Sequence, residues 1–297
     1  MSLAATFLAL SAILLWSFLA YFGASFRSLP PLFVVGVALC VSGLAGSLRW
    51  REWRLPWRTW AVGVGGIFGY HFLYFSAFQR APAVEVNLIN YLWPLLIVLL
   101  SPLFLPNHHL RSHHLLGALI GLAGATLILS GGRFRLDLAN MSGYLLAAGA
   151  ALTWACYSLL TKRLPPFSTA AVGGFCLLSG ALSLSAFALS GVALDLHKAL
   201  VGNGFSLLLM GLGPMGLAFF AWDAALKSGD PRVIGSLSYL TPLLSTFNLI
   251  LLGGQKLNWV SGVAMTLIVG GAAIGSLDLW KKSSPEEGRM VREGGRE

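Results

Sequence analysis

Ten apolar stretches of membrane-spanning length follow one another along the chain, separated only by short gaps. They cover residues 4–23, 32–48, 57–79, 84–105, 113–131, 141–161, 168–190, 203–226, 232–253 and 258–280. A bilayer core about 30 Å thick requires about 20 apolar residues per helix, and lipid offers no hydrogen bonds to an open strand. Only 10% of the residues are charged, against roughly 25% in soluble domains. The sequence therefore predicts an all-α integral membrane protein with ten transmembrane helices.

Basic residues in the gaps predict which helix ends face the cytoplasm. The formal net charge of +9 could suggest a nucleic-acid partner, but the basic residues are spread over the gaps rather than gathered in one patch. If the N-terminus is cytoplasmic, 14 of the 20 Lys and Arg residues fall on the cytoplasmic side, as the positive-inside rule requires. We therefore expect both termini in the cytoplasm, residues 281–297 as a charged cytoplasmic tail, and no nucleic-acid partner.

A proline-containing motif occurs twice in the chain. The sequence YLWPLL at 91–96 returns as YLTPLL at 239–244, 148 residues later, and Trp16 and Trp154 repeat with a similar offset. Each half then holds five predicted helices, an odd number, so the second half must enter the membrane from the opposite side. This pattern predicts two inverted five-helix repeats, residues 1–134 and 135–280, around a central cavity. That architecture is typical of transporters.

Polar and aromatic side chains recur every three or four residues within several of these stretches. A polar side chain that faces lipid is unfavourable, so such a stripe predicts the helix face turned to the protein interior. The candidate lining residues are Tyr70, His71, Tyr74, Asn87, Asn90, Tyr91, Trp93, Trp154, Trp222 and Tyr239. Ser, Thr and Asn residues could instead only hydrogen-bond neighbouring helices. His71 could be such a contact, a substrate ligand or a proton relay.

Tryptophan and proline residues interrupt the apolar stretches near their middles. Trp16, Trp93 and Trp154 lie away from the membrane interfaces, and each indole N–H needs a partner there, which favours a cavity. Pro94 and Pro242 each free a backbone carbonyl and bend the helix, which is tolerated at mid-membrane only against protein or a cavity. We interpret these two prolines as hinges of a rocking mechanism, with a static kink that improves packing as the alternative.

Charged residues are missing from the middle of every stretch. The acidic residues nearest to the membrane interior, Glu85, Asp223 and Asp278, lie near the ends of their stretches. A pump for protons or cationic drugs normally needs a buried carboxylate, and a phosphorylated substrate needs a buried cation. The sequence therefore favours a neutral or zwitterionic solute.

Sequence motifs of enzymes and metal centres are also missing or weak. The chain contains no H-E-x-x-H, no G-x-S-x-G and no phosphate-binding loop, so we expect no enzymatic activity and no cofactor. Four histidines gather in HHLRSHH at 108–114. They could bind a transition metal, but we prefer to interpret this segment as a solvated loop and predict no metal site.

The repeated Tyr-Leu-x-Pro-Leu motif, with the turns Ala81-Pro82 and Gly229-Asp230-Pro231 upstream of its two copies, resembles the EamA-type drug/metabolite transporter superfamily. The resemblance covers about residues 4–280. Within it, YLWPLLIVLLSPLFL and GYHFLYFSAFQRAP are similar to the YddG branch of bacterial amino acid exporters. The resemblance implies that the third, fourth, eighth and ninth helices build most of the cavity, with the first and sixth beside it. The residues it favours as lining are Tyr70, His71, Tyr74, Asn87, Tyr91, Trp93, Trp154, Trp222 and Tyr239.

The function implied by this resemblance is export of amino acids, aromatic ones among them, across the bacterial inner membrane by alternating access. The expected partners are the amino acid substrate and the lipid bilayer, and the chain could act as a monomer. Without a mid-membrane carboxylate we expect uncoupled export or a weak link to protons through His71. One alternative is a broad-specificity drug or metabolite effluxer on the same scaffold. Another is a membrane scaffold or sensor that transports nothing.

Overall fold

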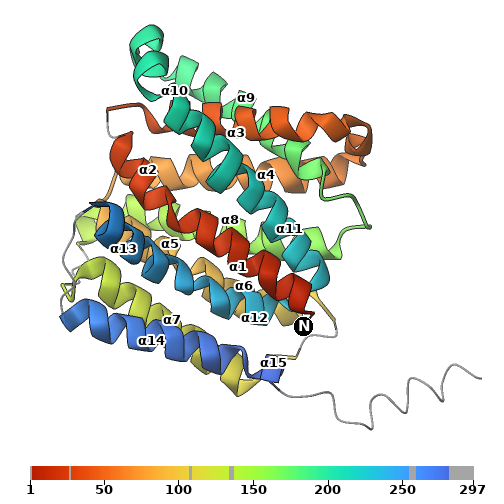
Figure 1. Ribbon diagram of the computed structural model, residues 1–297, viewed down its shortest axis with the longest axis vertical. Coiled ribbons are helices and arrows are strands. Elements are labelled where there is room, and N and C mark those ends of the chain that lie inside the picture. Colours follow the sequence, from red (N-terminus) through yellow and green to blue (C-terminus); the bar gives the residue numbers. More distant parts are fainter. Residues whose placement is uncertain (1, 27, 107–108, 134–136, 254–258, 281–297) are drawn as a thin grey trace, which may run out of the picture.

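The computed structural model describes residues 2–26, 28–106, 109–133, 137–253 and 259–280, and all regular elements among them are helices (Figure 1). The α-helices are α1 (Leu3–Ser17), α2 (Leu19–Ser25), α3 (Pro31–Gly46), α4 (Trp57–Phe78), α5 (Ala83–Asn90), α6 (Trp93–Phe104), α7 (Ser112–Ser130), α8 (Met141–Arg163), α9 (Ala171–Leu189), α10 (Leu196–Leu212), α11 (Ala218–Ser228), α12 (Pro231–Ser238), α13 (Leu240–Gly253), α14 (Trp259–Gly275) and α15 (Leu277–Trp280). Short helices η1 (Ser47–Trp53) and η2 (Leu138–Asn140) are 3-10, and η3 (Gly213–Leu217) is a π-helix. The predicted tail 281–297 and His108 lie outside the described residues.

Seven helical segments in the described chain are long and apolar enough to cross a membrane. They are Pro31–Trp53, Trp57–Phe78, Ala83–Phe104, Ser112–Ser130, Leu138–Arg163, Ala171–Leu189 and Leu196–Ser228. Three of the ten predicted stretches do not contain a single helix that is long enough to meet this criterion. The helices break at Phe18 in the first stretch and at Tyr239 in the ninth, and α14 in the tenth is 17 residues long. The structure thus supports a multi-pass helical membrane protein, while the count of ten spans stays a prediction.

In four of the apolar stretches the helix is interrupted. The interruptions lie at Phe18, at Tyr91 and Leu92 between α5 and α6, at the π-helix η3, and at Tyr239 between α12 and α13. Pro94 is the second residue of α6 and Pro242 the third residue of α13. A proline fits the first turn of a helix because its missing N–H needs no partner there. Each repeated proline therefore lies in the first turn of a helix just after an interruption, instead of in the middle of one continuous helix.

Glycine faces allow two pairs of helices to pack closely: α3 against α9, and α7 against α14, the pair at the bottom of Figure 1. A Cβ built on Gly117 of α7 would lie 2.3 Å from the backbone nitrogen of Gly275, and one on Gly43 of α3 would lie 2.5 Å from the Cβ of Leu177. Contacts this short leave no room for any side chain. These glycines are therefore required by close helix packing, as small residues commonly are in membrane proteins.

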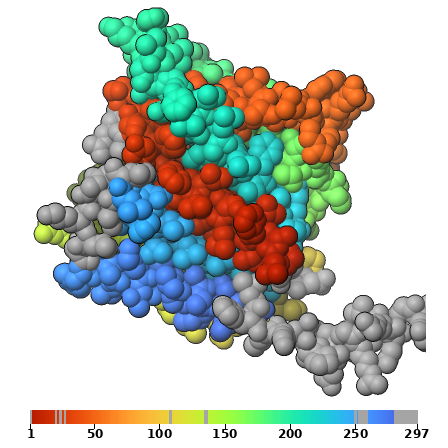
Figure 2. Space-filling view, viewed as in Figure 1, coloured from red at the N-terminus to blue at the C-terminus, as the bar shows by residue number. Residues whose placement is uncertain are grey.

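The outer surface of the molecule is apolar. Figure 2 shows one face, crossed by α1, α10 and the α13–α14 region. Large apolar side chains on these helices are exposed, among them Phe7 (71%), Phe205 (74%) and Val269 (51%). A contiguous apolar surface is unusual on a soluble monomer but is the surface that lipid requires. This face therefore agrees with a membrane setting.

The close packing of α7 against α14 generates a test with a matched control. Gly271→Ala would place a Cβ 2.5 Å from the backbone nitrogen of Gly121, whereas Gly270→Ala meets nothing within 4 Å. We expect Gly271→Ala to lower the free energy of unfolding by about 1–3 kcal/mol through overpacking. Gly270→Ala should leave it unchanged or slightly raised, because alanine favours helices. Thermal unfolding of both purified variants in detergent measures the difference, and equal melting temperatures would contradict the packing described.

Candidate functional site

A cavity of about 530 Å³ lies where the interrupted helices meet. Residues within two or three positions of each interruption line it: Trp16 and Leu19, Asn90, Tyr91 and Trp93, Met215, and Thr241 and Pro242. The remaining lining residues come from α3, α4, α5, α7, α8, α10, α11 and α13 and the segment after α2. A helix break exposes backbone polar groups, which in a membrane must face protein or an internal space. The cavity is therefore the place where these breaks can be accommodated.

Eight of the ten predicted lining residues border this cavity. They are Tyr70, His71 and Tyr74 of α4, Asn87 and Asn90 of α5, Tyr91, Trp93 of α6 and Trp154 of α8. Of the two prolines predicted as hinges, Pro242 borders the cavity and Pro94 is buried behind it. The structure thus brings together side chains that are as much as 84 residues apart in this group, from Tyr70 to Trp154.

Trp222 and Tyr239 lie behind the cavity wall instead of lining it. The indole Nε1 of Trp222 donates a hydrogen bond of 3.1 Å to Ser158 Oγ, and its ring lies 5.0 Å from that of Trp16. The hydroxyl of Tyr239 donates to the backbone oxygen of Tyr91 at 3.3 Å. Both side chains are almost completely buried. They support the lining residues from behind.

Aromatic rings form a continuous wall of the cavity. Trp154 is at its centre, with ring centroids 5.7 Å from Trp16, 5.1 Å from Tyr70 and 5.6 Å from Phe219. Tyr70 stacks in turn on Tyr74 at 5.5 Å with an angle of 13°. Such offset and edge-to-face pairs each add about 0.5–1.5 kcal/mol beyond the burial of area. The wall is therefore rigid and offers ring faces and edges to a bound molecule.

Hydrogen bonds within the chain use most of the polar groups that line the cavity. Tyr74 donates its hydroxyl to Asn87 Oδ1, and Asn87 Nδ2 donates to the oxygen of Ala83 at 2.9 Å. The Nδ1 of His71 lies 2.7 Å from the backbone oxygen of Ile67, which can only accept, so Nδ1 is the donor. These side chains are held in place by partners on their own or the next helix.

Two fully buried polar atoms of residues that line the cavity have no hydrogen-bond partner among the described residues: Asn90 Oδ1 and Thr241 Oγ1. Asn90 is 4% exposed and Thr241 is 6% exposed. The amide Nδ2 of Asn90 donates to the hydroxyl of Tyr70 at 3.2 Å, which fixes the orientation of the amide. A buried polar atom without a partner normally costs about 1–3 kcal/mol. Atoms of this kind mark where a ligand can supply the missing hydrogen bond.

Sequence reasoning missed Thr241, although the sequence carried a signal. Thr241 occupies the same position in YLTPLL that Trp93 occupies in YLWPLL, and both residues border the cavity. Phe219, which lies one helical turn before Trp222 in the same apolar stretch, also borders the cavity.

Ionised groups lie away from the cavity, whose described lining contains no Asp, Glu, Lys or Arg. Asp223 of α11 is 1% exposed and accepts hydrogen bonds from Lys227 Nζ at 2.6 Å and Thr169 Oγ1 at 2.7 Å. Glu85 accepts a hydrogen bond from the hydroxyl of Tyr144. A solute without net charge is therefore the kind that this cavity can hold.

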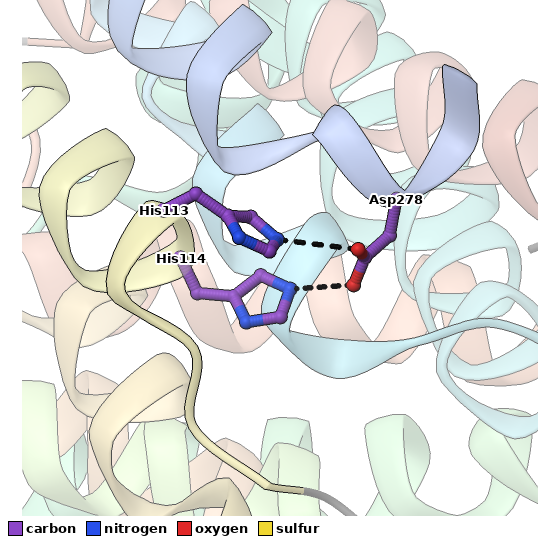
Figure 3. A group of neighbouring side chains, drawn as sticks. All are labelled: His113, His114 and Asp278. Carbon is purple, nitrogen blue, oxygen red and sulfur yellow. Dashed lines mark hydrogen bonds and ion pairs between the residues drawn. The ribbon is translucent and has the colours of Figure 1, made fainter. Parts of the chain in front are cut away.

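The histidine-rich segment meets Asp278 where α7 begins and α15 follows α14 (Figure 3). Nε2 of His114 lies 3.0 Å from Asp278 Oδ2, and Nε2 of His113 lies 3.3 Å from Oδ1. Arg111 donates to Oδ1 at 3.0 Å, and its backbone N–H donates to His114 Nδ1 at 3.4 Å. A neutral His114 then carries its proton on Nε2, facing the carboxylate. This geometry suits a hydrogen-bonded tie between α7 and α15. The interpretation of 108–114 as a solvated loop was wrong for His113 and His114, which lie in α7, where His114 is fully buried against Asp278.

Comparison with known proteins identifies the family. The EamA-like transporter family matches the chain twice, over residues 3–130 and 141–277. The chain belongs to the EamA-like transporter family. This EamA-like protein is 42% identical over 283 residues to the aromatic amino acid exporter YddG of Ancylobacter novellus, which covers 92% of this chain and 97% of that one. It is also 28% identical to the aromatic amino acid exporter YddG of Salmonella typhimurium, over 69% of each chain.

A solved crystal structure resembles this EamA-like protein closely. The two are 40% identical, with a TM-score of 0.87, and the match covers 93% of this chain and 98% of the other. The family and its relatives make this chain a membrane transporter of the YddG type and not an enzyme.

Proposed function

We propose that this protein is a secondary transporter that exports amino acids, aromatic ones among them, across the bacterial inner membrane. The observation that carries the proposal is the uncharged, ring-walled cavity of about 530 Å³ inside a transporter fold. Tyr70, Trp93 and Trp154 supply ring surfaces on which an aromatic side chain can stack. The two relatives named aromatic amino acid exporters agree with this substrate class.

The proposed architecture is two inverted five-helix repeats, residues 1–134 and 135–280, with both termini in the cytoplasm. Residues near a two-fold axis must contact their own equivalents. In support, Trp16 contacts Trp154, its partner in the repeat, and Tyr239 bonds to Tyr91, its partner in the motif. The closely packed pairs α3–α9 and α7–α14 likewise join the second stretch to the seventh and the fifth to the tenth.

Alternating access in this proposal uses the breaks before Pro94 and Pro242. Each break lets the two halves of its rod change their relative direction without breaking a continuous ladder of helical hydrogen bonds. The α3–α9 and α7–α14 pairs remain rigid because their glycines pack backbone against backbone. Movement of the interrupted helices against these pairs would open the cavity to one side of the membrane at a time.

Flux in proteoliposomes tests the proposed function and its cavity together. We expect the wild-type protein to transport phenylalanine, tyrosine and tryptophan, and Trp154→Ala and Tyr91→Ala to lower the initial rate at least about tenfold, since each removes a wall of the site. Trp57→Ala, which changes a tryptophan that is 75% exposed, is the matched control and should transport normally. Monodisperse elution in detergent confirms that each variant inserts and folds.

Two outcomes would overturn this account. Wild-type rates in both cavity variants would mean that the cavity is not the path of the substrate. Efficient competition by bulky organic cations would favour a broad-specificity effluxer, whereas the absence of a carboxylate from the described lining predicts none.

Export is proposed to be uncoupled from protons. His71 is the one side chain of the described lining, apart from tyrosines, that can gain or lose a proton. We expect initial rates of phenylalanine flux to be the same with and without a pH gradient, and His71→Phe to leave that ratio unchanged. Accumulation against the phenylalanine gradient, driven by a pH difference and lost in His71→Phe, would contradict the uncoupled mechanism.

A further inference from the structure

Two orphaned polar atoms sit at neighbouring helix breaks of the cavity. Asn90 is the last residue of α5, directly before Tyr91, and Thr241 is the second residue of α13, two positions after Tyr239. The hydroxyl of Tyr239 donates to the backbone oxygen of Tyr91, so the two breaks touch. Asn90 and Thr241 thus border one cavity from two adjoining breaks, and Asn90 Oδ1 and Thr241 Oγ1 are both buried and without a partner among the described residues.

The two atoms differ in the ligand group that suits them. Thr241 lies in the first turn of α13, a helix of 14 residues, where unpaired backbone N–H groups concentrate positive potential. Asn90 lies in the last turn of α5, where the carbonyl ends concentrate negative potential. Each break also holds a helix end of the opposite sign, because α6 begins at Trp93 and α12 ends at Ser238. The atoms themselves make the distinction: Asn90 Oδ1 can only accept a hydrogen bond, which suits an ammonium group, whereas the hydroxyl of Thr241 can donate one to a carboxylate.

We propose that Thr241 and Asn90 recognise the two charged ends of a zwitterionic amino acid. The hydroxyl of Thr241 donates a hydrogen bond to the α-carboxylate, and Oδ1 of Asn90 accepts one from the α-ammonium. The aromatic wall around Trp154 receives the side chain. This inference rests on the proposed function and extends it, because it assigns selection for amino acids to atoms distinct from the rings.

Several other polar groups near the cavity already have hydrogen-bond partners within the chain. Asn87 uses both ends of its amide within the chain, and the hydroxyl of Tyr239 is bonded to Tyr91. Thr246 also borders the cavity, but its hydroxyl donates to the oxygen of Pro242 at 2.9 Å. Thr246 therefore provides a matched control for Thr241 on the same helix.

Three ligands that each contain a phenyl ring distinguish the role of Thr241 from that of Asn90. Phenylalanine carries both charged ends, phenethylamine only the ammonium, and 3-phenylpropionate only the carboxylate. Thr241→Val should weaken binding of phenylalanine and 3-phenylpropionate about 10–100-fold, the effect of losing a hydrogen bond to a charged group, and should leave phenethylamine unchanged. Asn90→Leu should weaken binding of phenylalanine and phenethylamine and spare 3-phenylpropionate. Affinities are measured on the purified full-length protein by isothermal titration calorimetry.

Conservative variants distinguish the loss of a hydrogen bond to the ligand from misfolding of the protein. Thr241→Ser keeps the hydroxyl and should bind all three ligands like the wild type, and Thr246→Val should also bind normally. Asn90→Asp keeps an acceptor and should bind phenethylamine at least as tightly as the wild type. If Thr241→Val binds phenylalanine as tightly as Thr246→Val does, or if Asn90→Asp weakens phenethylamine, the assignment is wrong even when the wild type transports amino acids. If the wild-type protein neither binds nor transports any amino acid, the proposed function fails first.

Discussion

The structure depends on one constraint: lipid cannot form hydrogen bonds with an open backbone. Unbroken helices satisfy it alone, as α4, α7, α8 and α9 do. An interrupted helix can satisfy it only by turning its break toward protein or an internal space. The four interruptions do this in the same place, at the cavity that Trp154 borders. Facing lipid, these interruptions would leave backbone polar groups without hydrogen bonds. Facing the cavity, they bring helix ends and polar side chains to its wall.

A second consequence concerns how the two halves of the chain hold together. Helix association in lipid relies on close packing because lipid chains are as apolar as the helices. The glycine faces of α3 with α9 and of α7 with α14 provide this packing on the outside. At the centre, contacts of Trp16 with Trp154 and of Tyr239 with Tyr91 provide it between aromatic residues. Rigid helix pairs outside and interrupted helices inside agree with the alternating-access mechanism proposed above.

Helical periodicity and the repeated motif predicted the membrane class, the family and eight of the residues that border the cavity. Side chains at helical spacing, such as Tyr70 with Tyr74 or Asn87 with Asn90, identify the helix face that is turned to the protein interior. They do not show whether a given side chain borders the cavity or lies behind its wall. For that reason they could not show that Trp222 and Tyr239 lie behind the wall, since this is decided by partners such as Ser158 on another helix. Similarly, a proline in an apolar run predicts a disturbance, and the structure places a short interruption of the helix before Pro94 and before Pro242. The tie between His114 and Asp278, 164 residues apart, has no local signal at all.

The central claim is that an amino acid binds in the ring-walled cavity between the two halves. Anomalous diffraction from crystals grown with 4-bromophenylalanine tests it directly, because the bromine marks the position of the ring independently of any fitting of the ligand. The account predicts one bromine peak in the cavity, beside the rings of Trp154 and Tyr70. A bromine peak only on the lipid-facing surface or outside the cavity, with a protein sample that transports the compound, would contradict it.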